Sequence, residues 1–291
     1  MVNISNFLNK SFNFSPLGVN ESGLIIKGLL ETRSPFMVAR FGSVEIKGVL
    51  YPRLPWLIRK ALRHRTFSSM SNNAGFFSVS EENIKFFSEQ MIKDMQLVDA
   101  LGSWRVEEVL LKKYLESVIR LELDGLEPYY SDTPWSEGLK GLRVLVIHPF
   151  SKTIECQYLK NREKIFDNKN ILPEFRSFQT IRAVQTIAGN KGGFDNWFDA
   201  LQFMKSEIDE RDFDVALIGC GAYGFPLAAH VKRIGKQAIH LGGATQILFG
   251  IKGRRWDSHP IGLKFYNEYW VRPLPEDVPN DILKVENGCY W

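Results

Sequence analysis

Short apolar runs alternate with longer amphipathic stretches in the second half of the chain. Continuous apolar runs of strand length occupy residues 142–147, part of 175–187, 213–218 and 237–241. Apolar positions at helical spacing follow them, from about residue 151, over 196–208, over 225–234 and again after residue 243. Strands that alternate with helices of this length form parallel βαβ units. Right-handed crossovers then predict a Rossmann-like α/β fold, with a mostly parallel sheet and helices on both faces.

The first half follows the same pattern less regularly. Helical spacing covers residues 22–31, and the run 36–39 is typical of a buried strand that precedes a helix near residue 43. Further helices are expected over 54–65, from an N-cap at Ser80 to about residue 95, and over 105–119. Residues 126–142, which contain prolines and glycines, are expected to form a loop.

The length and composition favour one globular domain. A chain of 291 residues is near the upper limit of a single hydrophobic core. Its 44% apolar and 24% charged residues are ordinary for a globular protein. We expect an irregular lead-in over residues 1–20, one domain over 21–272 and a C-terminal tail, 273–291, packed on that domain.

Charge and cysteine usage narrow the functional classes. A net charge of +4 and a pI near 8.8 suit an anionic ligand or an acidic membrane surface, and fall short of a nucleic-acid-binding protein. Cys156, Cys220 and Cys289 have no CxxC pairing, which argues against a disulfide framework or zinc cluster and favours a reducing compartment. Because no signal peptide or run of about 18 apolar residues is evident, we expect a cytoplasmic protein.

Four unusual segments fall where strands are expected to end. They are residues 40–45, 148–153, 219–224 and 241–246. Ligands of an open parallel sheet bind just beyond the carboxyl ends of its strands. The four segments should therefore meet in one ligand site.

The third segment, GCGAYG, matches GxGxxG between a strand and a helix. Glycines there let backbone N–H groups approach a phosphate. The candidate phosphate-binding residues are Gly219, Gly221, Tyr223 and Gly224. NAD binding would need an acid near the end of the next strand, where residues 239–241 are Ile-His-Leu. S-adenosylmethionine binding is an alternative, although Leu217 stands where that loop usually has an acid, and a tight junction without any ligand is another.

A second glycine junction follows the last expected strand. Its candidate donor-binding residues are Gly242, Gly243, Thr245 and Gln246, unless Thr245 serves only as a helix N-cap. The cations Lys252, Arg254 and Arg255 follow closely. They could neutralise a diphosphate leaving group, or form only a solvated surface.

Two residues are candidates for acid–base chemistry. His148 would act as a general base if it titrates near neutral pH, and otherwise only hydrogen-bonds a neighbour. Glu45 could act as a general base, bind a divalent metal, or serve as a helix-start acid favoured by the helix dipole. Candidate donor- and phosphate-binding residues beside them are Arg40, Gly42, Ser151, Lys152 and Thr153.

Residues 54–65 form a basic amphipathic stretch. The basic residues of this region, within a stretch that contains no acid, are Arg53, Arg59, Lys60, Arg63 and Arg65. Such a helix can lie on an anionic membrane, which would be the inner face of the cell membrane for a cytoplasmic protein, or pack on the core with a solvated face.

The segment RFGSVE, residues 40–45, resembles the RFGDGE-type motif of bacterial GT-D-fold glycosyltransferases. The segments HPFSKTI, IGCGAYGFPLAAHVKRIGKQAIHLGGATQILFGIKGRRW and the terminal GCYW are similar to a GT-D-like family of surface-polysaccharide biosynthesis, so the resemblance covers about Ser34 to Trp291. It implies a metal- and donor-binding acidic pair, of which Glu45 is the second member. Ser43 stands in place of the first acid, which puts dependence on Mn or Mg in doubt.

The resemblance and the residues together lead to one functional hypothesis. We expect transfer of a sugar from a nucleotide-diphosphate donor, most simply a UDP- or dTDP-sugar, to a carbohydrate or lipid-linked acceptor in cell-surface glycan biosynthesis. The alternatives are an S-adenosylmethionine-dependent methyltransferase acting on a glycan, and a non-catalytic nucleotide- or glycan-binding protein.

Overall fold

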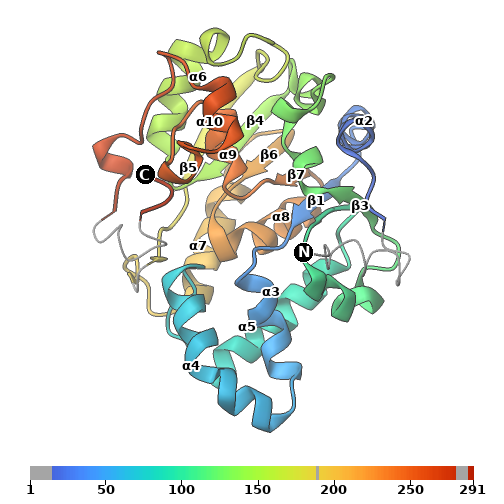
Figure 1. The fold of residues 1–291 in the computed structure, drawn as a ribbon, viewed down its shortest axis with the longest axis vertical. Helices are drawn as coiled ribbons and strands as arrows, with labels where there is room; N and C mark the ends of the chain where they lie inside the picture. Colours follow the sequence, from blue (N-terminus) through green and yellow to red (C-terminus); the bar gives the residue numbers. More distant parts are fainter. Residues whose placement is uncertain (1–14, 188–189, 280–287) are drawn as a thin grey trace.

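Seven parallel strands form one sheet in the computed structural model, which describes residues 15–187, 190–279 and 288–291 (Figure 1). Their order across the sheet is β3-β2-β1-β7-β6-β4-β5, and every recorded pairing is parallel. The strands are β1 Phe36–Arg40, β2 Ala100–Ser103, β3 Ile119–Glu122, β4 Arg143–His148, β5 Ser177–Arg182, β6 Val215–Ile218 and β7 Gln237–His240. The predicted Rossmann-like α/β fold is therefore confirmed.

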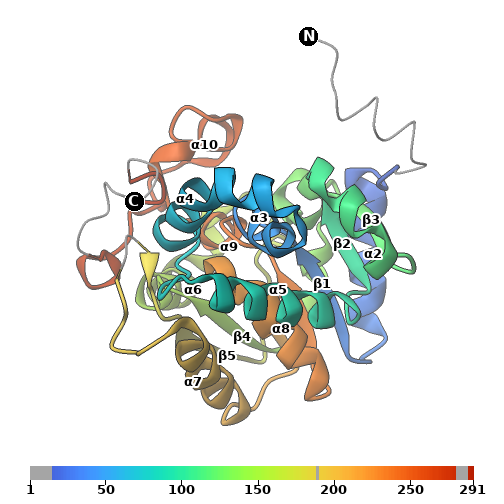
Figure 2. The same cartoon turned by 90° about the horizontal axis from the view of Figure 1, so that it is seen from below.

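Helices cover both faces of the sheet. They are α2 Val19–Glu31, α3 Glu45–Leu50, α4 Trp56–Asn72, α5 Glu81–Met95, α6 Ser151–Ile165, α7 Trp197–Asp209, α8 Gly224–Arg233, α9 Ala244–Leu248 and α10 Pro260–Phe265. The expected N-cap at Ser80 is confirmed, because its hydroxyl accepts a hydrogen bond from the Asn83 amide at 3.0 Å. In Figure 2, which is seen from below, α3, α4 and α5 lie in front of the sheet.

The two faces of the sheet carry separate hydrophobic cores. In β1, Met37 and Ala39 point to the core built with α3, α5, α7 and α8, whereas Phe36 and Val38 point to the core built with α2, α6 and α9. This alternation is the two-residue period of a strand that is buried on both sides. The apolar runs of the sequence are continuous for this reason.

Two strands and one helix differ from the sequence prediction. The strands β2 and β3 were not expected, and the helix expected over 105–119 is a 3₁₀ helix, Val106–Tyr114, that ends before β3. β2 has the sequence ALGS, and its Gly102 faces Leu126, whose Cδ2 would lie 2.8 Å from an added β-carbon. A strand of four residues that needs a glycine for packing lacks the apolar run by which strands are recognised.

The helix α4 projects from the lower end of the molecule in Figure 1. Met70 is its one buried residue, so most of its 17 residues are in contact with solvent. Across the described ranges, no helix combines the length and the apolar character needed to cross a bilayer.

Candidate functional site

A cleft of about 230 Å³ lies beyond the carboxyl ends of the strands. The order of strands reverses near it, since the chain runs outward from β1 to β3 on one side and from β4 to β5 on the other. Residues at or just after six strand ends line it: Arg40, Trp104, His148, Thr186, Gly219 and His240. The C-terminal residues Tyr290 and Trp291 also line it. All four segments singled out in the sequence contribute to the lining. Segments 40–45, 219–224 and 241–246 contribute several residues each, and segment 148–153 contributes residues 148 to 150.

Arg40, the last residue of β1, is a cation set into the cleft wall. Its guanidinium lies over the ring of Trp104, 5.0 Å from the centroid. A β-carbon at residue 242 would stand 2.6 Å from its Nη1, and Gly242 has a φ of +63°, so both space and backbone favour glycine there. Burial lowers the pKa of Arg40, and its Nε has no hydrogen-bond partner among the described residues. A desolvated guanidinium with an unused donor suits an anionic ligand.

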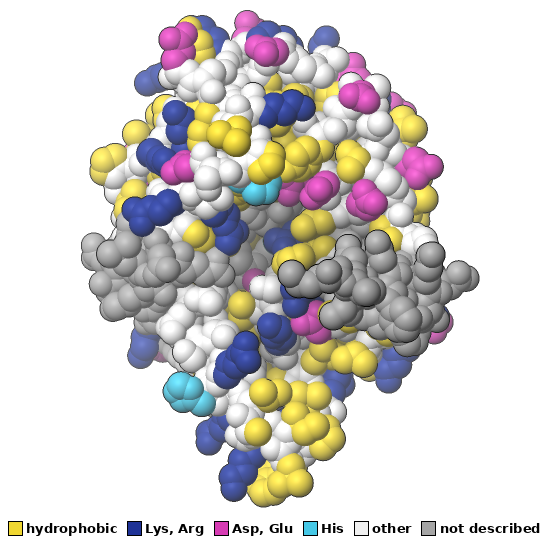
Figure 3. Space-filling model, in the orientation of Figure 1, with side chains coloured by type: hydrophobic (Ala, Val, Ile, Leu, Met, Phe, Trp, Pro, Cys, Tyr) yellow, Lys and Arg dark blue, Asp and Glu magenta, His cyan; other side chains and the backbone are white. Residues whose placement is uncertain are grey.

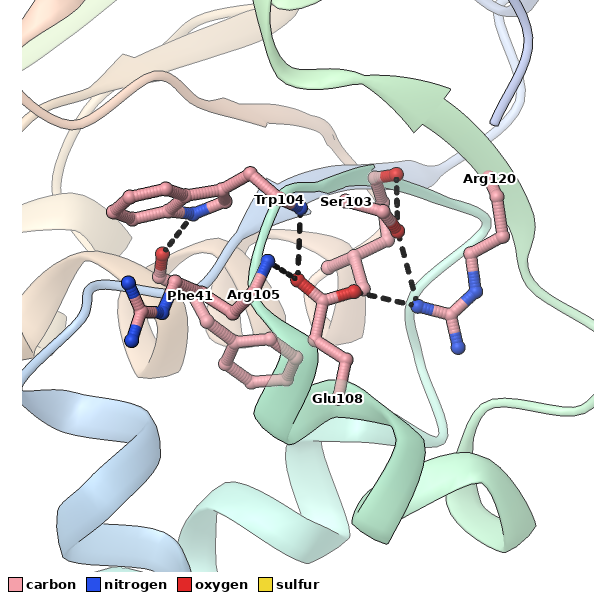
Figure 4. Close-up of polar contacts among 7 residues, drawn as sticks. Phe41, Ser103, Trp104, Arg105, Glu108 and Arg120 are labelled. Atoms are coloured by element: carbon pink, nitrogen blue, oxygen red, sulfur yellow. Dashed lines mark hydrogen bonds and ion pairs between the residues drawn. The ribbon is translucent and has the colours of Figure 1, made fainter. Parts of the chain in front are cut away.

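The loop that carries Trp104 is held by a buried carboxylate (Figure 4). Oε1 of Glu108 accepts the backbone N–H groups of Trp104 and Arg105, each at 3.1 Å, and Oε2 accepts Nη1 of Arg120 at 3.0 Å. The indole N–H of Trp104 donates to the carbonyl of Phe41 at 2.8 Å. Burial raises the pKa of Glu108, while these hydrogen bonds and Arg120 oppose that effect. The network fixes the ring on which Arg40 rests.

Glu45 is the first residue of α3 and lines the cleft. Its carboxylate folds back over Gly42, so that a β-carbon at residue 42 would lie 1.7 Å from its Oε2. The negative charge of Glu45 raises the pKa of Arg40 and so opposes the effect of burial on that guanidinium. Gly42 therefore makes room for a carboxylate at the strand end. No group of three metal-ligating side chains occurs within the described part of the chain.

Two buried histidines, His148 and His240, line the cleft as opposite tautomers. Nδ1 of His148 accepts the Phe150 N–H at 2.9 Å, which leaves the proton on Nε2. Nδ1 of His240 lies 3.1 Å from the Ile218 carbonyl, which can only accept, so its Nε2 carries the lone pair. Burial lowers the pKa of each histidine to about 3. At neutral pH both rings are uncharged, and His148 is placed to donate a hydrogen bond rather than to take a proton.

The glycines of the GCGAYG loop each have a packing role. A β-carbon at Gly224 would stand 2.2 Å from Cε1 of His240, and one at Gly219 would stand 2.5 Å from the Gly242 carbonyl oxygen. Gly221 has a φ of +54°, and the next amide, of Ala222, donates to the carbonyl of Ala74 at 3.1 Å. The loop thus brings its neighbours into close contact, and its role in phosphate binding stays a prediction.

Tyr223 lines the cleft, and its hydroxyl is hydrogen-bonded. That hydroxyl lies 2.9 Å from Oγ1 of Thr186, which donates to the carbonyl of Gly75, and the ring of Tyr223 stacks on Trp197 at 4.9 Å. Burial raises the pKa of Tyr223 well above its ordinary value. The residue therefore joins the loops after β5 and β6 as a neutral phenol.

The second glycine junction leads into α9, a helix of five residues. Thr245 lies inside this helix and the N-cap position is Gly243, so Thr245 is not the cap that the sequence suggested. Oγ1 of Thr245 and Oε1 of Gln246 are buried without a hydrogen-bond partner in the described residues. The amide nitrogen of Gln246 donates to the carbonyls of Ile251 and Tyr290. Gln246 lines the cleft, and its Oε1 is a buried acceptor that is not in use within the described residues.

Of the three cations after α9, Arg255 is the one that lines the cleft. Its guanidinium lies 4.5 Å from the ring centroid of Tyr290, and its Nη1 donates to the Tyr290 hydroxyl at 3.3 Å. Lys252 instead lies over Tyr266 at 5.3 Å, and Arg254 is outside the lining. The hypothesis that the three cations balance the donor charge stays a prediction, and the cleft lining favours Arg255 among them.

The start of α6 was predicted to bind phosphate, which stays a prediction, and in the structure it contacts a carboxylate of the protein itself. Oδ2 of Asp277 accepts the backbone N–H of Thr153 at 2.7 Å and its hydroxyl at 2.6 Å. Ser151, Lys152 and Thr153 do not line the cleft, and Lys152 pairs with Glu155 on the surface. The protein's own carboxylate thus occupies the position assigned to an anionic ligand.

Sequence reasoning missed Trp104, His240 and the last two residues as cleft residues. Trp291 is 8% exposed, its Nε1 has no partner among the residues that the structure describes, and its ring packs on Phe150 at 6.0 Å. The terminal GCYW segment was noted only as part of a family resemblance. The described part of the predicted tail, through Asp277 and Trp291, contacts the domain.

Two solved structures are similar to this chain. One is a selenomethionine-substituted domain of unknown function 1792, with 15% identity, a TM-score of 0.45 and 82% of each chain covered. The other is described by the statement that the same highly conserved domain has a distinct glycosyltransferase fold, with 16% identity, a TM-score of 0.41 and 78% of each chain covered. No protein-family model and no curated protein matches the chain. The likeness is one of overall arrangement, and a functional assignment depends on the residues of the cleft.

Proposed function

We propose that this protein is a glycosyltransferase that binds a nucleotide-diphosphate sugar in the cleft. The observation that carries the proposal is Arg40, a guanidinium with an unpartnered Nε among the described residues, set at the carboxyl ends of parallel strands. Arg255 supplies a second positive charge in the same lining. A diphosphate between these two groups would gain charge-assisted hydrogen bonds in a partly desolvated site.

Aromatic and polar groups of the cleft suit the rest of the donor. The rings of Trp104 and Tyr290 lie beside Arg40 and Arg255 and offer apolar surface to a base or a sugar. Oε1 of Gln246 and Nε1 of Trp291 are a buried acceptor and a buried donor without a partner among the described residues, and small side-chain movements would bring them to a ligand. One acceptor and one donor suit the edge of a pyrimidine, so we favour a UDP- or dTDP-sugar.

The residues support a simple transfer reaction. The acceptor hydroxyl loses its proton to the Glu45 carboxylate as its oxygen bonds to the anomeric carbon. The bond from that carbon to the diphosphate oxygen breaks, and the nucleoside diphosphate leaves with the electron pair. Arg40 and Arg255 stabilise the charge that develops on it. His148 can donate a hydrogen bond through its Nε2–H to the sugar or to the leaving group.

A divalent cation is a secondary part of the proposal. Glu45 is the candidate protein ligand in the cleft, because Ser43 stands where the resembled family has its other acid. One carboxylate would hold Mn or Mg only together with donor phosphates and water. The acceptor is proposed to be a carbohydrate or a lipid-linked glycan of the cell surface.

A thermal-shift experiment with nucleotides tests the proposal. UDP or dTDP should raise the melting temperature, because a ligand that binds only the folded state stabilises it. Arg40→Gln should weaken that binding about 10- to 100-fold, since it removes a charged hydrogen-bond donor. Arg65→Gln, on the exposed part of α4, is the matched control. A response to S-adenosylmethionine alone, with none to any nucleoside diphosphate, would replace the proposal with methyl transfer.

A further inference from the structure

The N-terminal half of α4 exposes large apolar side chains. Trp56, Leu57, Ile58 and Leu62 are 62%, 70%, 46% and 37% exposed. Scattered apolar residues on a surface need no explanation, but these four share little more than one turn and a half of one helix. Figure 3 shows hydrophobic side chains gathered at the lower end of the molecule, where Figure 1 places α4.

The contacts that α4 makes with the domain show which of its faces points outward. Arg59 and Arg63, four residues apart, both lie near Glu81 of α5, with N–O distances of 3.7 and 3.5 Å. They mark the side that faces the domain. By the 3.6-residue period, Leu57 and Ile58 point well away from that side, and Leu62, four residues after Ile58, lies on the flank of the helix. These three residues form an apolar stripe over the outward and lateral surface of the helix.

The charged residues of α4 and of the segment before it are all basic. Residues 46–80 contain no Asp or Glu. Lys60 and Arg65 are exposed beside the stripe, and Arg53 is exposed just before the helix. In Figure 3, Lys and Arg side chains flank the apolar cluster. Side chains that serve the protein core are shielded from solvent, whereas these apolar and basic side chains are exposed.

We propose that α4 docks on the anionic surface of a lipid bilayer. The stripe would enter the boundary between headgroups and acyl chains, and Lys60, Arg65 and Arg53 would contact anionic headgroups, as in an interfacial amphipathic helix. Two observations favour a bilayer over a second copy of the chain. The projecting helix carries one sign of charge, which two copies would bring together, and Trp56 at its first turn is a residue type enriched at membrane interfaces.

The helix that carries the docking surface leads to the cleft. It ends at Asn72, and the next three residues, 73–75, line the cleft. A bilayer bound at the first half of α4 would lie roughly 15 Å along the helix from that cleft wall. If the proposed function holds, the acceptor is then a membrane-anchored glycan; this consequence rests on that function, whereas the docking itself does not.

Vesicle sedimentation without any nucleotide tests the docking. The protein should bind vesicles of equal parts phosphatidylcholine and phosphatidylglycerol, and binding should weaken as salt is added. Replacing Leu57, Ile58 and Leu62 by Ser together should lower binding about tenfold or more. Lys60→Gln and Arg65→Gln should each lower it about fivefold. Leu159→Ser is the matched control, since Leu159 on α6 is 68% exposed and lies outside this surface.

Three outcomes would overturn the proposal. They are equal binding to pure phosphatidylcholine, unchanged binding by the triple Ser variant, and a dimer in analytical ultracentrifugation that the triple Ser variant dissociates. Thermal unfolding of each variant checks that the fold is intact. Because no donor is present, a failure of the proposed function leaves these results unchanged.

Discussion

The carboxylate of Glu45 occupies the space that a side chain at Gly42 would take. A β-carbon at residue 42 would stand 1.7 Å from Oε2 and 2.3 Å from Cδ of Glu45. The smallest possible substitution therefore displaces the carboxylate. The glycine and the acid act as one unit, in which the first sets the position of the second.

Gly42→Ala should impair turnover without removing any functional group. The methyl group forces Glu45 to another rotamer, so the transfer rate should fall about tenfold or more if proton transfer depends on its position. Gly28→Ala is the control, because Gly28 lies in α2 with no heavy atom within 4 Å of an added β-carbon. That variant should be neutral or more stable by up to about 1 kcal/mol. Equal rates for the two variants would show that the Glu45 position does not matter.

Glu45→Gln should separate a general base from a metal ligand. The change keeps the size and removes the charge, so loss of a base should lower turnover about 100- to 10,000-fold with little change in donor affinity. A metal ligand would lower donor affinity as well, and added Mn should partly restore it. Transfer rates with Mn and with a chelator measure both effects. A rate within about threefold of the parent under all conditions would leave Glu45 as a helix-start acid.

Acid should destabilise the fold through the two cleft histidines. Burial lowers the pKa of His148 and of His240 to about 3, from an ordinary value near 6.5. Between these values the unfolded chain binds more protons than the folded one, so the free energy of unfolding falls as the pH drops below about 6.5. At pH 5.5 the loss is on the order of 1 kcal/mol for each histidine.

Urea unfolding as a function of pH measures this effect. His148→Asn and His240→Asn keep a polar atom near the Nδ1 position, and each should flatten the acid side of the stability profile. His64→Asn, at an exposed position on α4, is the control. Parallel profiles for all three variants would mean that the buried rings do not set the slope.

Asp277→Ala should destabilise the protein and leave donor binding intact. The substitution leaves the N–H and the hydroxyl of Thr153 without their carboxylate at the start of α6. Loss of such a buried partner costs about 1 to 3 kcal/mol of unfolding free energy. UDP binding at a temperature where the variant is folded should equal that of the parent. A loss of nucleotide affinity instead would return the start of α6 to the donor site.

The sequence predicts the central strands well because they are buried on both faces. β4, β6 and β7 appear as continuous apolar runs, and the loops after them are the unusual segments of the chain. Arg40, Glu45 and His148 could be found from their places at strand ends. The strands β2, inside the sheet, and β3, at its edge, could not, because each has four residues of which only two are apolar enough to suggest a strand.

Long-range contacts explain what the sequence could not show in the site. Spacing along the chain cannot reveal that Asp277 reaches Thr153 from 124 residues away, or that Trp291 closes the cleft. The backbone conformation of Gly221 could not be predicted from the sequence either. The motif alone suggests that a Val at this position would test phosphate contact. The φ of Gly221 is +54°, however, so a branched side chain would also strain the backbone.

The pairing of β1 with β7 sets the order in which the protein can mature. Phe36 pairs with Gln237, so the inner edge of the first strand waits for a partner made about 200 residues later. At translation rates of about 5 to 20 residues per second, that edge stays open for roughly 10 to 40 seconds on the ribosome. Arg40 meets Gly242 only when the two strands join, and Trp291 is made later still. A nascent chain therefore has no complete cleft until residues 290 and 291 have been made, and chaperones that shield strand edges should bind it while the edge of β1 is open.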